Sequence, residues 1–109
     1  MARNEFGHTL DSNGYAPSLM NKTDYTCYVC GAEGILARHE PLGGPSRQKS
    51  KRLGLWVSIC PACHELAHGA GILAHATALQ LKQDAQKTAM DEFGWSTEEF
   101  IQQFGKNYL

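Results

Sequence analysis

Apolar residues along the chain follow a helical period most clearly in its last third. From about position 73 to 93 they recur every three or four residues and form one face of a predicted helix. These positions are Ala74, Ala78, Leu81, Ala85, Ala89 and Phe93. Gly94 is expected to end this helix, and Ser96 with Glu99 has the spacing of a capping box that starts a last short helix. The inner side of that last helix is predicted to carry Phe100, Ile101 and Phe104.

The middle of the chain changes to the pattern of a strand, a loop, a second strand and a helix. A short apolar run, 35–37, leads into Arg38-His39-Glu40, and the Pro and Gly residues of 41–45 predict a loop. The apolar, β-branched and aromatic segment 53–59 predicts the second strand. Pro61 suits the first turn of a helix, which is expected over 61–68.

The length of 109 residues, with 42% hydrophobic and 19% charged residues, predicts a single small folded domain. Within it we expect a loose N-terminal arm over 1–12, a core over 25–70 and a helical extension over 72–109. A turn at Asn13-Gly14 and packing of 15–20 on the core are also expected. The chain contains no run of about 18 apolar residues and begins without the apolar core of a signal peptide. We therefore expect no membrane segment and a location in the cytoplasm.

Four cysteines form two Cys-x-x-Cys pairs, which indicate a metal site. Cys27 and Cys30 make the first pair, and Cys60 and Cys63 make the second. In a reducing compartment such pairs favour a tetrahedral zinc ion over disulfides, because each pair supplies two thiolates from one tight turn. Gly31 provides the permissive backbone that such a turn needs. A structural Zn²⁺ would stabilise a chain of this size directly.

Three histidines point to a second site in the same region. His64 and His68 lie four residues apart on the predicted helix, so they share a face and can chelate one metal ion. His39 ends the first strand, from which it can face that helix across the hairpin. Because four thiolates complete the zinc site, these histidines would serve another ion or a catalytic role. His75 is a further candidate in place of His68, although we expect it on the surface.

The formal net charge of −1 excludes a uniformly basic nucleic-acid coat protein, but the charge is unevenly distributed. Residues 36–56 carry five basic and one acidic residue, a local charge of +4, whereas 82–109 carry three basic and five acidic residues, a local charge of −2. The basic residues in the predicted loop are expected to contact phosphates. They are Arg47, Lys49, Lys51 and Arg52.

The order of these motifs resembles a known family. Two Cys-x-x-Cys knuckles, a strand ending in His, a Gly-rich basic loop, a second strand and Cys-x-x-Cys-His-x-x-x-His resemble the zinc-stapled HNH endonucleases, also called ββα-metal or His-Me finger nucleases. More closely, the chain is similar to small HNH-like proteins of bacteriophages and prophages. The resemblance covers residues 13–109 and is carried by Asn13-Gly14-Tyr15-Ala16-Pro17-Ser18, Cys27-Tyr28-Val29-Cys30-Gly31, Arg38-His39-Glu40, Arg47-Gln48-Lys49-Ser50, Gly54-Leu55-Trp56-Val57, Cys60-Pro61-Ala62-Cys63-His64 and Phe104-Gly105-Lys106-Asn107-Tyr108-Leu109.

The resemblance implies an α+β fold in which a two-stranded hairpin packs on a helix, with one catalytic divalent ion between them (Mg²⁺, Mn²⁺, Ni²⁺ or Zn²⁺). By position, His64 and His68 match the metal ligands of the helix. The family's Asn, which ties the loop to the backbone, corresponds here to Leu55. Two alignments of the first strand stay open. Either His39 is the ligand and Glu40 stands at the position of the general base, or His39 is the base and Arg38 stands at the ligand position. We lean to His39 as the residue that touches the reacting water or the metal, with Glu40 as its partner or a ligand.

The activity implied is metal-dependent hydrolysis of DNA phosphodiester bonds with low sequence specificity, in the cytoplasm of a bacterial host. His39 or Glu40 would accept the proton of the attacking water. The alternative is a catalytically degenerate zinc module that binds DNA or a phage protein, the latter through the C-terminal helices. The oligomeric state is left open.

Overall fold

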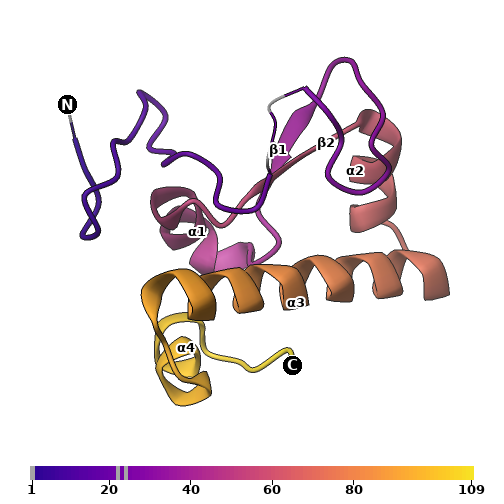
Figure 1. Ribbon diagram of the computed structural model, residues 1–109. Helices are drawn as coiled ribbons and strands as arrows, with labels where there is room; N and C mark the ends of the chain where they lie inside the picture. The colour runs from indigo at the N-terminus through magenta and orange to yellow at the C-terminus, as the bar shows by residue number, and fades with distance from the viewer. Residues whose placement is uncertain (1, 22, 24) are drawn as a thin grey trace.

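The computed structural model describes residues 2–21, 23 and 25–109 as a two-stranded sheet with helices around it (Figure 1). Met1, part of the predicted N-terminal arm, lies outside the described residues. In chain order the elements are β1 (Ala37–His39), a 3-10 turn η1 (Gly44–Ser46), α1 (Arg47–Leu53), β2 (Val57–Ile59), α2 (Pro61–His68), α3 (Ile72–Phe93) and α4 (Thr97–Phe104). This is a small α+β fold, as the sequence predicted.

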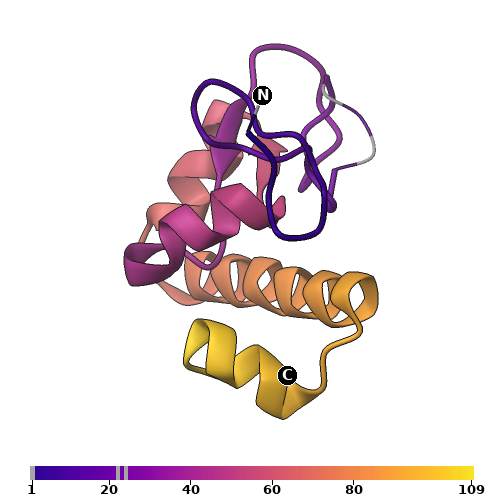
Figure 2. The ribbon, with the colours of Figure 1, turned by 90° about the vertical axis from the view of Figure 1, so that its left-hand side faces the viewer.

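Strands β1 and β2 form a hairpin that carries His39 at the end of β1. The strands are antiparallel, and His39 pairs with Val57 while Ala37 pairs with Ile59. All three residues of β2 are buried, and α2 packs against both β1 and α3. In both views the long helix α3 lies between the hairpin region and α4 (Figures 1 and 2). The first strand therefore faces α2.

The second strand starts later than predicted, because the residues before it form a helix. The basic run expected in a loop is α1, and Leu53, expected in the strand, is its last residue. Gly54 ends α1 in the left-handed region, at φ 76°, where a Cβ atom would collide with the carbonyl oxygen of Pro17. The apolar pattern of 53–59 was misread as one strand. Leu53 is buried as the last residue of α1, and Leu55 is buried in the turn that follows it, before β2 begins.

The three C-terminal helices agree with the sequence in position and largely in burial. α2 and the capping box of Ser96 and Glu99 are as predicted, and α3 begins only one residue earlier. Of the inner residues expected for α4, Phe100 and Phe104 are buried, whereas Ile101 is 37% exposed. The prediction that Ile101 lies on the inner side is therefore wrong.

The N-terminal segment packs against the domain, in contrast to the loose arm predicted. Asn4 is buried and donates a 2.8 Å hydrogen bond from its side-chain amide to the carbonyl oxygen of Arg52. Glu5 pairs with the Arg52 guanidinium, and the Phe6 ring stacks on Phe93 at 4.2 Å between centroids. These contacts tie residues 4–6 to α1 and to the end of α3. The expected packing of 15–20 on the core is confirmed by the burial of Ala16 and Met20.

None of the helices described combines the length and apolar character needed to cross a membrane.

Candidate metal centres

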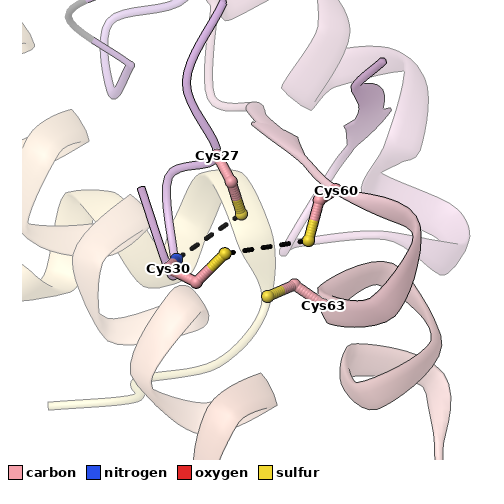
Figure 3. Close-up of side chains that lie close together, drawn as sticks. All are labelled: Cys27, Cys30, Cys60 and Cys63. Carbon is pink, nitrogen blue, oxygen red and sulfur yellow. Dashed lines mark hydrogen bonds between the residues drawn. The ribbon is translucent and has the colours of Figure 1, made fainter. Parts of the chain in front are cut away.

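The four cysteines come together at one end of the hairpin (Figure 3). Cys27 and Cys30 flank a tight turn that is closed by Gly31 at φ 78°, and Cys60 and Cys63 lie at the start of α2. Their sulfur atoms all lie within 4.8 Å of one another, and the Sγ atoms of Cys30 and Cys60 are 3.8 Å apart. A tetrahedral ion with Zn–S bonds of about 2.3 Å separates its sulfurs by about 3.8 Å. The donor set therefore fits one structural metal ion.

The thiols of this cluster influence one another's protonation. Burial raises the pKa of the Cys27 thiol, but hydrogen bonds from the backbone N–H groups of Cys30 and Cys60 outweigh it and lower that pKa to about 6. Burial and then its hydrogen bonds with the other thiols raise the pKa of Cys63. The backbone thus stabilises the thiolate form of Cys27, whereas burial and the neighbouring thiols disfavour the thiolate form of Cys63. A bound cation would remove that opposition, since metal ligation deprotonates a thiol.

The three histidines form a second cluster between β1 and α2. One ring nitrogen from each of His39, His64 and His68 lies within 4.8 Å of the others. The Nε2 atoms of His64 and His68 are 3.1 Å apart, and the His39 ring lies 5.6 Å and 5.0 Å from their centroids. His39 is the least exposed of the three and His68 the most. Three imidazoles with one open, solvent-facing side are a donor set typical of a divalent transition metal.

His39 is held uncharged by its surroundings. Burial, followed by the nearby rings of His68 and His64, lowers its pKa to about 4. A neutral imidazole keeps a lone pair free to bind a cation or accept a proton. His39 therefore fits either of the two roles that the sequence left open.

The strand geometry separates the neighbours of His39. Arg38 points to the other face of the hairpin, where its guanidinium pairs with Asp11 at 3.0 Å and lies 4.3 Å from the centre of the Tyr15 ring. Glu40 lines the same hollow as the three histidines but lies outside the convergent group. Its carboxylate accepts a 2.7 Å hydrogen bond from Nε of Arg47, and its side chain is only 6% exposed. His39, rather than Glu40, is thus the strand residue that meets His64 and His68.

Of the four basic residues predicted to contact phosphates, only Arg47 lies beside the histidines. The other three side chains contact different parts of the molecule. Lys49 donates to the carbonyl oxygen of Gln103 at 2.6 Å, and Lys51 lies 4.7 Å from the centre of the Tyr15 ring. Arg52 pairs with Glu5. The prediction assumed a loop that gathers these side chains, whereas the structure places them on a helix, from which only Arg47 lines the hollow of the histidines.

Two residues important for the site were not singled out from the sequence. Ser50 is fully buried, and its hydroxyl lies 3.0 Å from the carbonyl oxygen of Leu42 and 2.9 Å from that of Ser46. It joins α1 to the loop that follows β1. Gln86 is buried on α3 and binds the C-terminal tail. The sequence held one indication of this role, because Gln86 is a polar residue next to the apolar face of the predicted helix.

His75, the other candidate ligand, is exposed on α3 and outside the cluster.

No protein-family model matches the chain, and comparisons with curated proteins and with solved structures give no match. The function is therefore argued from the geometry of the two clusters.

Proposed function

We propose that the chain is a metal-dependent endonuclease of the HNH type that hydrolyses DNA phosphodiester bonds with low sequence specificity. The observation that carries the proposal is the convergence of His39, His64 and His68 between a hairpin and a helix, apart from the four cysteines. The cysteines hold a structural zinc ion and the histidines a second divalent cation.

Each cluster has its own task in this proposal. The four thiolates join the first knuckle to the start of α2, so that the hairpin and the helix keep their relative position. A cation held by the three imidazoles would supply Lewis-acid stabilisation of the charge that develops on the phosphate and the leaving oxygen. His64 and His68 present their nitrogens from one helical face, and His39 completes the set from the strand.

Glu40 and Arg47 extend the site on the open side. Because His39 faces the two helix histidines, Glu40 is the remaining group in this hollow that can accept a proton from a water molecule. Arg47 fixes one carboxylate oxygen of Glu40 through Nε. Its side chain is 61% exposed, so its guanidinium can also reach a phosphate oxygen in the hollow. The pair thus orients a base and provides a phosphate contact.

The test is nicking of supercoiled plasmid DNA by the zinc-loaded chain with Mg²⁺, Mn²⁺ or Ni²⁺ added. We expect cation-dependent nicking that is abolished in His64→Ala and His68→Ala. His8→Ala is the matched control, because His8 lies in the N-terminal segment, outside the cluster and the hollow around it. If no cation supports nicking, or if His64→Ala nicks like the parent, the nuclease proposal is wrong.

The alternative, a zinc module without catalytic activity, has one observation in its favour: Arg47 already neutralises Glu40. DNA binding by a parent protein that nicks with none of the three cations would support this alternative.

A further inference from the structure

Three adjoining hollows form a groove that passes the histidine cluster. The first, of about 330 Å³, contains His64 and Arg47 in its wall and shares His39 and His68 with the second, of about 300 Å³. The second reaches Lys82 of α3. The site described above therefore continues beyond His68, on the side away from Arg47.

The third hollow, of about 400 Å³, continues the groove to the C-terminal tail. It shares Lys82 and Tyr108 with the second hollow and adds Lys106. Among the described residues that line the three hollows, Glu40 is the only acidic one, and it is paired with Arg47. The groove is thus basic at both ends, although the chain as a whole has a formal charge of −1.

The two lysines at the far end are held close to one aromatic ring. The Nζ atoms of Lys82 and Lys106 each lie 5.6 Å from the centre of the Tyr108 ring. Within the described part of the chain, neither lysine forms an ion pair. Each ammonium group is thus within cation–π reach of the ring and is left without a carboxylate partner among the described residues, so it can bind an anion that enters the groove.

The tail that carries Lys106 and Tyr108 is fixed by a buried side chain. Gln86 donates a 2.8 Å hydrogen bond to Oδ1 of Asn107, and its own Oε1 accepts a 2.7 Å bond from the Tyr108 N–H. Gln83 adds a 2.9 Å bond to the carbonyl oxygen of Tyr108. Burying the side-chain amide of Gln86 is costly unless its polar atoms form hydrogen bonds, and the tail provides them. The same hydrogen bonds hold the tail in place.

We propose that the C-terminal tail and α3 form the second half of a nucleic-acid track, in which Lys82 and Lys106 bind backbone phosphates on the side of the histidine cluster opposite Arg47. Tyr108 is a positioning residue that keeps the two ammonium groups at the groove. This inference rests on the proposed function and names the contacts of its substrate. It also replaces Lys49, Lys51 and Arg52, which lie outside the three hollows.

The experiment is fluorescence anisotropy of labelled DNA with the full, zinc-loaded chain and no added second cation, over a range of salt concentrations. Lys82→Gln and Lys106→Gln are each expected to weaken binding about 3-fold and to reduce the slope of log K against log salt by about 1. Lys87→Gln is the matched control, because Lys87 is exposed on the same helix and outside the groove. If Lys82→Gln and Lys106→Gln both bind DNA with the affinity of Lys87→Gln, the proposed track is wrong.

Plasmid nicking by the same proteins separates this inference from the proposed function. If the parent nicks DNA but Lys82→Gln and Lys106→Gln bind and nick like Lys87→Gln, the track is wrong and the nuclease remains. If binding depends on both lysines but no cation supports nicking, the track stands and the nuclease is wrong.

Discussion

The Nε2 atoms of His64 and His68 lie 3.1 Å apart on one face of α2. Two nitrogens bound to one ion at about 2.0–2.1 Å are separated by roughly 3 Å, so the two rings need only small shifts to share a cation. His39 approaches the same point from β1. Helix spacing alone supplies two of the ligands, whereas the third requires the hairpin to pack on α2.

Metal content should distinguish the two clusters. We expect two tightly held cations per chain, one of them zinc, by elemental analysis after gel filtration in zinc and nickel. His64→Ala should lose one cation and keep its fold. Cys63→Ser should lose the zinc and unfold at a much lower temperature, because metal ligation contributes folding energy directly. A Cys63→Ser protein that keeps both cations and its Tm would contradict the structural assignment.

Ser50 should contribute to stability far more than a neighbouring serine. Ser50→Ala leaves the buried carbonyl oxygen of Leu42 without its side-chain partner, and we expect a loss of about 1–3 kcal/mol in the free energy of unfolding. Ser46→Ala is the control, because its half-buried side chain makes no capping hydrogen bond at the start of α1, and a change within about 0.5 kcal/mol is expected. Urea denaturation of both variants provides the comparison. Equal losses would show that the Ser50 hydroxyl does not hold the loop.

Several parts of the fold could be read from the sequence because they depend on local rules. Periodic apolar residues, Gly94 and the capping box defined α3 and α4, and Pro61 marked the start of α2. The spacing of each cysteine pair places its two thiols in one turn, and the chemistry of a shared metal ion predicted that the two pairs meet.

The rest depended on contacts between distant segments. Helix α1 carries no apolar period over its seven residues, and its end is set by the close approach of Pro17 to Gly54. The direction of each basic side chain follows from that helix. Likewise, only the packed hairpin decides that His39, and not Glu40, meets the helix histidines.

Tyr28 should titrate at unusually high pH. Burial, and then its 2.9 Å hydrogen bond to Asp84, raise its pKa to about 12 from 10.0. Because the folded state binds this proton more tightly, the stabilisation is complete below pH 10 and is lost as the pH rises towards 12. Ultraviolet absorbance of phenolate should show a late step that is missing in Tyr28→Phe. A titration curve that is unchanged by this substitution would contradict the assignment.

Gln86 should control the order of the C-terminal tail. Gln86→Leu keeps a side chain of similar size but removes both hydrogen bonds to Asn107 and Tyr108. We expect faster amide exchange over 106–109 and faster trimming by a carboxypeptidase, with α3 still folded. Gln80→Leu is the control, because Gln80 is exposed on the same helix and bonds only to Asp84. Equal exchange in the tail of both variants would show that Gln86 does not hold it.

The roles of His39 and Glu40 can be separated by measuring cation affinity and nicking rate in the same variants. If His39 is a ligand and Glu40 the base, His39→Ala should weaken binding of the second cation strongly. Glu40→Gln should then leave that affinity nearly unchanged and lower the rate about 100-fold or more, as expected for loss of a general base.

The opposite assignment gives the opposite pattern. If His39 is the base, His39→Ala should still bind the cation through His64 and His68 but should nick DNA much more slowly. Glu40→Gln should then retain most of its activity. Calorimetric titration with Ni²⁺ and plasmid nicking at saturating cation distinguish the two. We expect the first pattern, because the His39 ring lies only 5.0 Å from the His68 ring and its nitrogen belongs to the convergent group, whereas Glu40 faces Arg47.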